Sequence, residues 1–474
     1  METVIEILEY FIYVLLAIMV LVFVHEMGHF LFAKLFKMRV ERFSVGFPPV
    51  ILGKKFGETE YVIGATPLGG YVKISGMVDE SMDNDFAESP PQPWEFRSKP
   101  VWQRIVVITA GVIFNIILAG IIFVLLKVNS EDVYIPAENI SNVYVTEGSL
   151  MHDIGLRTGD RLVLVNGEPL ERFDDFFNIE ALTASELKIT VERDGEQLTF
   201  TGPPDIMTQL NRLGSDMDIG VSYLPPLIGG VVENTPASEA GLQAGDRIVR
   251  IDSTDVMFWQ QMSERIQDAE GLPITLTWIR PDSLEQPVMN SDTSYVVDAG
   301  FAAYTGTVSP TEIVTETGTH FGIGIYDASG PLLWEEFGLV RNAYTPGEAV
   351  VGGITDTWVH TKLIITGLSR MISGRENLRE NMGGPIAIAK VTKQAADHSW
   401  AAFWRIVAIL SITLAIVNIL PIPALDGGHL MFLIYEGITR REPSFKLRMI
   451  MQNIGMLVLF AFMAFLILND ILRL

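Results

Sequence analysis

Cysteine is absent from the 474 residues of this chain, so disulfide bonds and thiol catalysis are excluded. Basic residues are in the minority, since 34 Lys and Arg against 57 Asp and Glu give a formal net charge of −23. A chain this acidic lacks the positive surface that nucleic acids require, so we expect no nucleic-acid partner. Charged residues make up only 19% of the chain and hydrophobic residues 49%, which predicts an integral membrane protein with sizeable aqueous parts.

Four segments are long and apolar enough to cross a lipid bilayer as helices. They are approximately residues 4–24, running on into the motif described below, and 105–126, 401–420 and 450–468. Residues 129–348 hold about 36 acidic and about 11 basic side chains, so nearly the whole net charge lies between the second and third segments. The sequence therefore predicts a soluble, acidic block inserted into a membrane protein with four spans.

Lysine and arginine cluster in the two short loops that follow the first and third spans. They are Lys34, Lys37, Arg39, Arg42, Lys54, Lys55, Arg97, Lys99 and Arg104, and then Arg440, Arg441, Lys446 and Arg448. Because cytoplasmic loops are enriched in these residues, both loops are predicted to face the cytoplasm. The acidic block and both termini are then predicted to lie on the outer side.

The motif His25-Glu26-Met27-Gly28-His29 lies directly after residues 10–24, which carry no charge. Residues i and i+4 share one face of a helix, so both imidazoles can bind one Zn²⁺, and Glu26 can act as general base on the metal-bound water. Ionisable residues at membrane depth are costly and are usually functional. The alternative is a chance match, expected on the order of once in one to two hundred sequences of this composition.

Asp426 is the candidate third ligand. His25 and Asp426 lie about 20 and about 25 residues along two spans of the same direction, which places both roughly 30 to 40 Å along their helices, toward the cytoplasmic leaflet. Two histidines and a carboxylate leave one tetrahedral position open, as in a catalytic zinc site. The alternative is a turn or capping carboxylate before Gly427 and Gly428.

The residues before Asp426 predict a break in the third span. Pro421 and Pro423 remove backbone donors and do not allow a regular helix behind them. Non-helical backbone at membrane depth persists only where protein or a water-filled cavity satisfies it, and hydrolysis needs such a cavity. Asn418 is a candidate donor to a developing oxyanion or to the substrate backbone. Its alternative role is to satisfy backbone groups freed by the break.

The acidic block contains an internal repeat, because residues 155–167 recur 86 residues later as residues 241–253. Each copy predicts a helix ending at Gly-Leu, a tight Gly-Asp turn and an alternating strand. The Gly-Leu-x-x-Gly-Asp pattern resembles PDZ domains of bacterial membrane and envelope proteases, whose grooves bind peptide C-termini by strand addition. The second copy matches better, with Asn234 to Gly241 before its turn. A steric or spacing module that binds no peptide is the alternative.

Residues 43–75 alternate like strands between glycines and prolines. They predict a small sheet dipping into the membrane, whose edge offers pairing to an unwound substrate strand, with an ordinary cytoplasmic hairpin as the alternative. We assign Gly70 and Tyr71 of this sheet, together with Pro421 and Pro423, to substrate binding. Residues 346–395 are mildly amphipathic and predict helices lying at the outer surface.

Taken together, these motifs resemble the site-2 protease family of intramembrane zinc metalloproteases, in particular the regulator of sigma-E branch with two PDZ domains. The resemblance covers nearly the whole chain. It rests on His25 to His29, residues 69–73, the two repeats, residues 383–386 and residues 418–427. It implies that His25, His29 and Asp426 bind Zn²⁺, that Glu26 is the catalytic base and that Asn418 assists substrate binding.

The resemblance also implies substrates and a location. The family cleaves single-span membrane proteins after a first protease has removed the outer domain, so anti-sigma factors of the envelope stress response and signal-peptide remnants are the expected substrates. The expected location is the bacterial inner membrane, with periplasmic PDZ domains and an active site toward the cytoplasmic side. One departure is Val112, where the family usually has proline after Ala-Gly, which removes support for a kink there. Asn115 is expected to line the cavity.

The predicted fold is a multi-pass α-helical membrane protein with four transmembrane helices, a small membrane-associated β-sheet and two inserted α+β PDZ domains. In chain order the predicted parts are the first transmembrane helix with the zinc motif (1–36), the cytoplasmic-side sheet (37–100), the second transmembrane helix (101–128), the first PDZ domain (129–225), the second PDZ domain (226–330), the outer-surface helices (331–398), the third transmembrane helix (399–441) and the fourth (446–472).

Three functions remain in competition at this point: a protease, a PDZ scaffold with a structural zinc, and a transporter whose intramembrane His and Asp form an ion pathway. Transporters usually show repeated membrane halves, whereas the repeat here lies in the soluble block. A structural zinc site needs no base, so Glu26 between the two histidines favours the protease over the scaffold. The sequence therefore predicts a zinc metalloendopeptidase acting within the bilayer.

Overall fold

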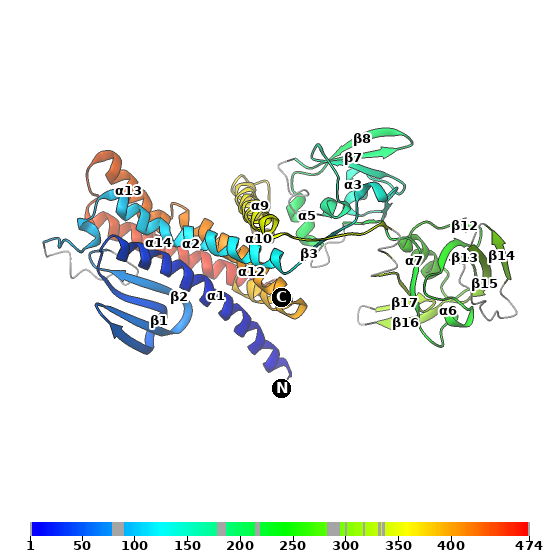
Figure 1. The fold of residues 1–474 in the computed structure, drawn as a ribbon, viewed down its shortest axis with the longest axis horizontal. Helices are drawn as coiled ribbons and strands as arrows, with labels where there is room; N and C mark the ends of the chain where they lie inside the picture. The colour runs from blue at the N-terminus through cyan, green and yellow to red at the C-terminus, as the bar shows by residue number, and fades with distance from the viewer. Residues whose placement is uncertain are drawn as a thin grey trace. The chain divides into compact units, whose positions relative to one another are not determined.

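The computed structural model describes residues 2–77, 90–177, 186–213, 219–281, 294–298, 301–315, 318–329, 333 and 337–472. The chain divides into two compact units (Figure 1). The first unit joins Met1–Glu131 to Ala343–Leu474, and the second is Asp132–Asn342. The inserted block expected from the charge distribution is thus a structural unit of its own, with ends close to those predicted.

The membrane unit is built on four long apolar helices, as the hydropathy predicts. They are α1 (Glu2–Leu35), α2 (Val101–Val128), α12 (Trp400–Ile419) and α14 (Phe445–Ile471). Their candidate spans are Tyr10–Leu35, Val101–Val128, Trp400–Ile419 and Lys446–Ile471. Both α1 and α12 pack along α2, around a core that includes Ala17, Phe123, Phe403 and Ile412.

Small residues let α1 and α2 approach closely. A Cβ atom on Gly28 would lie 2.5 Å from the carbonyl oxygen of Ala110, so only glycine fits there without a shift of the backbone. Helix packing in membranes depends on such small residues, because lipid is as apolar as the side chains and gives no hydrophobic driving force between helices. The contact fixes α2 directly beside the zinc motif.

The third span is interrupted, as Pro421 and Pro423 predict. Helix α12 ends at Ile419, residues 420–425 are not helical, and α13 (Asp426–Thr439) starts directly at the candidate ligand. The loop packs against two glycines: a Cβ on Gly427 would lie 2.0 Å from the Leu420 oxygen, and one on Gly455 of α14 would lie 2.0 Å from the Pro423 oxygen. Helices α13 and α14 therefore pack closely against this irregular backbone.

Three further helices lie in the range predicted as amphipathic: α9 (Pro346–Ile372), α10 (Leu378–Asn381) and α11 (Pro385–His398). Helix α9 packs along α2, where a Cβ on Gly353 would lie 2.6 Å from the Val124 nitrogen. The Gly-Gly-Pro-Ile motif, residues 383–386, lies at the start of α11. The Asp470 carboxylate caps this helix start, since it accepts hydrogen bonds from Gly384 N, Ile386 N and Ala387 N at 2.8 to 3.1 Å. Their placement at the outer surface stays a prediction.

The predicted small sheet is present as two long strands, β1 (Val40–Phe56) and β2 (Thr59–Ile74), and a short 3-10 helix (Phe96–Ser98) precedes α2. Residues 40–45 of β1 pair with β2 on both sides, with residues 70–74 on one side and residues 60–63 on the other. The second half of β1, residues 50–56, pairs with residues 59–64 of β2. The hairpin therefore folds back on itself into four extended segments. Segment 70–74 forms one edge, and β2 contacts α1.

The second unit has two hydrophobic cores, one within residues 135–221 and one within 228–323, so the predicted boundary at 225 falls between them. The first core is formed by β4 (Tyr144–Val145), α3 (Leu150–Ile154), β5 (Arg161–Val165), β6 (Glu168–Pro169), β7 (Lys188–Arg193), β8 (Glu196–Thr201), α5 (Ile206–Arg212) and β9 (Val221–Ser222), with the sheet order β6-β5-β7-β8. The chain enters through β3 (Glu131–Tyr134) and leaves through β19 (Val340–Ala343), and these two strands pair.

The second core begins with the same order of elements, a strand, a short helix and two strands. It contains β10 (Ile228–Val231), α6 (Pro236–Glu239), β11 (Arg247–Ile251), β12 (Thr254–Asp255), α7 (Trp259–Asp268), β13 (Ile274–Pro281), β14 (Ser294–Asp298), β15 (Phe301–Val308), β16 (Thr311–Thr315), β17 (Gly318–Gly322) and β18 (Ile325–Asp327). Its main sheet has the order β12-β11-β13-β15-β14. The repeated sequence thus forms a short helix, a turn and a strand in both copies, as predicted.

The repeated aspartate explains part of the repeated motif. Asp160 and Asp246 are both fully buried, and each is bound by an arginine from a strand further along the chain. Arg193 Nε donates to Asp160 at 2.6 Å, and Arg280 Nε donates to Asp246 at 2.5 Å. Each guanidinium also donates to the carbonyl of the motif glycine at 2.9 Å. The Gly-Asp turn is therefore tied to the sheet in the same way twice; that the copies are PDZ domains stays a prediction.

Candidate metal centre

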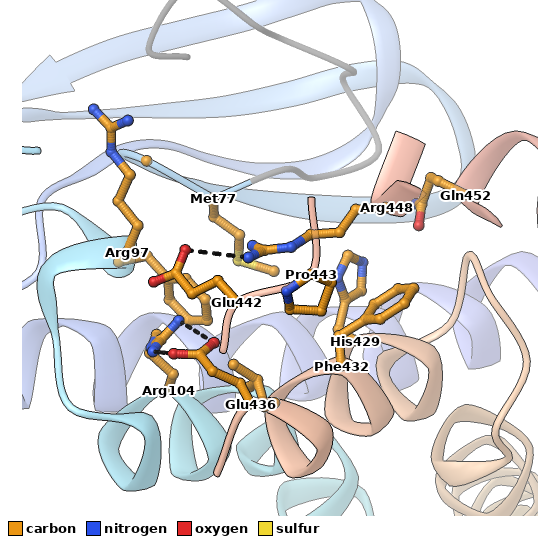
Figure 2. Close-up of a pocket in the computed structure, with 13 residues that line it drawn as sticks. Met77, Arg97, Arg104, His429, Phe432, Glu436, Glu442, Pro443, Arg448 and Gln452 are labelled. Carbon is orange, nitrogen blue, oxygen red and sulfur yellow. Dashed lines mark hydrogen bonds and ion pairs between the residues drawn. The ribbon is translucent and has the colours of Figure 1, made fainter. Parts of the chain in front are cut away.

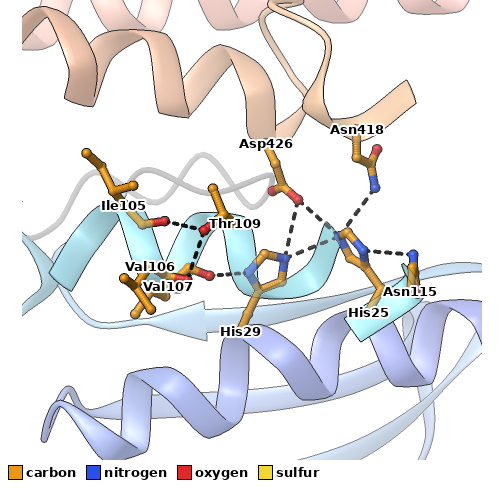
Figure 3. Close-up of polar contacts among 9 residues, drawn as sticks. All are labelled: His25, His29, Ile105, Val106, Val107, Thr109, Asn115, Asn418 and Asp426. Atoms are coloured by element: carbon orange, nitrogen blue, oxygen red, sulfur yellow. Dashed lines mark hydrogen bonds and ion pairs between the residues drawn. The ribbon is translucent and has the colours of Figure 1, made fainter. Parts of the chain in front are cut away.

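His25 and His29 project from the same face of α1, as their spacing requires (Figure 3). Both side chains are buried, with 7% of each residue exposed. Their Nε2 atoms lie 3.2 Å apart, so the two imidazoles direct their outer nitrogens toward one point. The helix alone therefore supplies two of the predicted ligands in place.

Asp426 completes the cluster from a segment about 400 residues away in sequence. As the first residue of α13, it places Oδ2 3.1 Å from His25 Nε2 and 3.5 Å from His29 Nε2. The candidate ligand atoms of the three residues all lie within 4.8 Å of one another. The structure thus brings together the two segments that the depth argument pairs.

The donor set fits Zn²⁺. Asp426 Oδ2 is buried and makes no hydrogen bond in the described structure, although two imidazole nitrogens face it. A cation shared by these three atoms satisfies all of them at once. Two imidazoles and one carboxylate are typical zinc ligands, and three protein ligands leave the fourth tetrahedral position for water or substrate, which is the arrangement of a catalytic site.

Helix α2 supports this cluster from behind. His29 Nδ1 lies 2.8 Å from the carbonyl oxygen of Val107, which can only accept, so the Nδ1 proton is held there and Nε2 is left to bind metal. Gly111 leaves room for the rings, because a Cβ there would lie 2.5 Å from His29 Nε2 and 2.7 Å from His25 Cε1. Asn115 lies 3.1 Å from His25 Nδ1. The sequence signal for Asn115 was its polarity within an apolar span; Val107 acts through its backbone and gave no signal.

Glu26 lies on α1 beside the edge of the small sheet and is half-buried. A Cβ on Gly70 would lie 3.3 Å from Glu26 Cγ and 2.8 Å from Val22, so glycine lets the strand pass close to the helix. Tyr71 points to another partner: its hydroxyl accepts from Arg42 Nη1 at 3.2 Å, and its ring stacks on Phe47. The structure therefore brings Gly70 to the candidate base.

The remaining predicted residues lie on the segment that ends α12. Asn418 Nδ2 lies 3.3 Å from His25 Nε2, on the metal side of that ring (Figure 3). Pro421 is exposed, whereas the backbone of Pro423 packs against Gly455. Asn418 thus reaches the cluster directly, Gly70 lies beside Glu26, and Pro423 helps to hold the loop. The assignment of all these residues to substrate binding stays a prediction.

A polar pocket of about 180 Å³ lies at the ends of α2, α13 and α14 (Figure 2). Within it Arg104 of α2 donates to Glu436 of α13 through both terminal nitrogens, and both side chains are buried. His429, one turn after Asp426, also lines this pocket. The ion pair holds α13 against α2, and therefore holds Asp426 near the histidines. Sequence reasoning missed this pair because its members are 332 residues apart.

A ligand set of the catalytic zinc type, with a glutamate between its histidines and apolar helices around it, defines an intramembrane metalloprotease. Comparison with known sequences agrees, since residues 13–462 match Peptidase family M50. The chain is 30% identical over 481 residues to "Regulator of sigma-E protease RseP" of Escherichia coli, covering 97% of this chain and 98% of that protein. The protein of the same name from Salmonella typhimurium is 29% identical over 482 residues, with the same coverage.

A "Putative zinc metalloprotease" of Vibrio cholerae is 28% identical over 489 residues, covering 99% of this chain and 100% of that protein. The protein therefore belongs to peptidase family M50, the site-2 protease family. It is a multi-pass inner-membrane zinc metalloprotease, as the sequence predicts.

Proposed function

We propose that this protease cleaves single-span membrane proteins within the bilayer after a first protease has removed their outer domains. The observation that carries the proposal is the His25, His29 and Asp426 cluster, with Glu26 next to it in sequence and beside Gly70 at the edge of the small sheet. Anti-sigma factors of the envelope stress response are the first substrate class, supported by the names of the relatives. Remnant signal peptides, which are also short membrane spans, are the second.

The chemistry follows from the residues around the cluster. Zn²⁺, when bound, makes a water nucleophilic at neutral pH and polarises the substrate carbonyl. Glu26 accepts the proton of the attacking water and passes it to the leaving amine, which is general acid–base catalysis by one carboxylate. The Asn418 amide, 3.3 Å from His25 Nε2, donates to the substrate carbonyl oxygen as negative charge develops on it.

The small sheet presents the substrate. A peptide bond within a helix has its N–H and C=O engaged, so the substrate span must unwind before it is cut. Segment 70–74 pairs with residues 40–45 along one edge, and no strand of the described residues pairs with its other edge. An unwound substrate segment adds to this edge as a strand. Gly70, which lacks a side chain, then allows its backbone to pass close to Glu26.

The orientation completes the proposal. The basic loops support an orientation in which the metal cluster lies toward the cytoplasmic leaflet and the second unit lies in the periplasm. The repeats of the second unit, which we assign as PDZ domains, filter substrates by the size of their outer domain. In a competing view, the grooves of these repeats bind the peptide C-termini that the first cleavage exposes.

The decisive experiment replaces Glu26 by glutamine, which keeps the size of the side chain and removes its basicity. Zinc content and turnover of a single-span substrate are measured on the same purified protein. We expect zinc to remain at the wild-type level and turnover to fall by about 10²- to 10⁴-fold, the usual contribution of a general base. His25→Ala is the matched control, which should lose both zinc and turnover. Wild-type turnover by Glu26→Gln contradicts the assigned role.

A further inference from the structure

The two histidines of the cluster differ in how their inner nitrogens are held. His29 Nδ1 faces the Val107 carbonyl at 2.8 Å, so its proton has a single possible place. His25 Nδ1 instead faces the side-chain amide of Asn115 at 3.1 Å. An amide can donate through its nitrogen or accept through its oxygen, so this contact alone leaves two tautomers of His25 open.

The surroundings decide between the tautomers. Asn115 is fully buried. Among the residues that the structure describes, none forms a hydrogen bond with its Oδ1, whereas its Nδ2 lies 3.1 Å from His25 Nδ1. If Nδ2 donated to His25 Nδ1, the ring proton would be on Nε2, which is the atom that faces His29 and Asp426. A protonated Nε2 cannot bind a metal.

We propose that Asn115 is a positioning residue for the metal centre. Turned by 180° about its terminal bond, its side-chain oxygen accepts the Nδ1 proton of His25 and thereby leaves Nε2 free for Zn²⁺. The nitrogen and oxygen of an amide have nearly the same shape, so this turn requires no change in packing. Helix α2 then fixes both ligand rings, His29 through the Val107 backbone and His25 through the Asn115 side chain. This inference rests on the proposed zinc ligands.

The backbone around Asn115 is suited to hold such a contact. Ser411 of α12, also fully buried, donates from Oγ to the Asn115 carbonyl oxygen at 2.8 Å. Asn115 is thus fixed between α1, which carries the histidines, and α12, which leads to Asn418 and the broken segment. Because the backbone of Asn115 is held in this way, its side chain resists a small rotation of the His25 ring.

The test compares two replacements of Asn115 in the full-length detergent-solubilised protein, with zinc dissociation constants measured by competition with a chromophoric chelator. Asn115→Leu keeps the approximate shape and removes the acceptor, so we expect zinc affinity to fall by about 10- to 100-fold, as for other residues that orient a metal-binding histidine. Asn115→Asp keeps an oxygen acceptor and removes the amide nitrogen, so we expect affinity within about threefold of wild type or tighter. If Asn115→Asp binds zinc as weakly as Asn115→Leu, an oxygen acceptor at this position does not hold the His25 ring for the metal, and the proposal is overturned.

Two controls separate this inference from the proposed zinc site. Gly120→Ala, a substitution on the same helix whose Cβ would lie 3.6 Å from Thr357 Oγ1, should leave zinc affinity close to wild type. If His25→Ala retains zinc, the proposed ligand set itself is wrong. If His25→Ala loses zinc while Asn115→Leu binds it normally, only the positioning role is refuted. Thermal unfolding of the metal-free variants reports folding, and if Asn115→Leu does not fold, a loss of affinity in Asn115→Asp still refutes the proposal.

Discussion

Gly111 of α2 offers a sharp perturbation of the metal centre by a single methyl group. In Gly111→Ala the new Cβ would lie 2.5 Å from His29 Nε2 and 2.8 Å from His25 Nε2. Ordinary contacts between such atoms are about 3.5 to 4.0 Å, so the His29 ring must move by about 1 Å. Its Nδ1 is held at 2.8 Å by the Val107 carbonyl, which opposes that movement.

The size of the effect follows from the tolerance of metal coordination. Zinc–nitrogen bonds are about 2.0 to 2.1 Å long, and a site tolerates deviations of about 0.2 Å. A shift of about 1 Å therefore removes one ligand, which exceeds the ~10- to 100-fold loss from disturbing a residue behind a ligand. We expect zinc affinity to fall by at least about 100-fold and proteolysis to be lost with it. The substitution should not destabilise the helix itself, because alanine is about 1 kcal/mol more favourable than glycine in a helix interior.

The assay measures the zinc dissociation constant and substrate cleavage for Gly111→Ala beside a control on the same helix. Gly120→Ala is that control, since among the described residues its Cβ would meet only Thr357 Oγ1, at an ordinary contact distance of 3.6 Å. It should keep wild-type zinc affinity. Normal zinc binding by Gly111→Ala would show that the rings do not occupy the positions described, and the reasoning would fail.

Two further predictions concern topology and the second unit. Because the chain has no cysteine, single cysteines that replace Lys54, Ser149 and Ser238 can be labelled with an impermeant thiol reagent on intact spheroplasts. We expect labelling at positions 149 and 238 only. Labelling at position 54 but not at position 149 contradicts the orientation. Arg280→Met leaves buried Asp246 without its partner, so we expect a loss of about 3 to 5 kcal/mol of unfolding free energy in urea denaturation. Arg250→Met, which breaks an exposed pair, should cost less than about 1 kcal/mol; equal losses would refute the argument.

The parts of the fold that the sequence predicts well are those that local pattern encodes. A long apolar run specifies a membrane helix, two prolines specify the end of α12, and the spacing of His25 and His29 specifies a shared helix face. Asp426 was found from its depth, because two spans of the same direction place residues at comparable levels. In each case a few neighbouring residues carry the information.

The parts that sequence reasoning missed depend on pairings between distant segments. Arg104 and Glu436 are each an ordinary charged residue near a helix end, and only the packing of α13 on α2 makes them a buried pair. The double pairing of β1 with both halves of β2 likewise has no local signature. The repeat showed that Asp160 and Asp246 matter but did not identify their arginine partners, since those come from a strand whose register is set by the sheet.

The way the second unit is attached makes its gating role testable. The chain enters it through β3, directly after α2, and leaves through β19, directly before α9, and these strands pair with each other. The entry and exit points therefore lie side by side, so deleting residues 135–325 and joining the ends with a short flexible linker should leave the membrane unit folded. The metal cluster, Glu26 and Asn418 all belong to the membrane unit.

The deletion variant distinguishes a size filter from a peptide receptor. If the unit excludes substrates with a large outer domain, the variant should cleave a trimmed substrate at about the wild-type rate and should also cleave the untrimmed one. If a groove must capture the new C-terminus left by the first protease, the variant should cleave the trimmed substrate more slowly and gain nothing on the other. Zinc content, measured on the same preparations, confirms that the membrane unit is intact. We expect the first outcome, because the chemistry at Glu26 and the strand edge at Gly70 require no residue of the second unit.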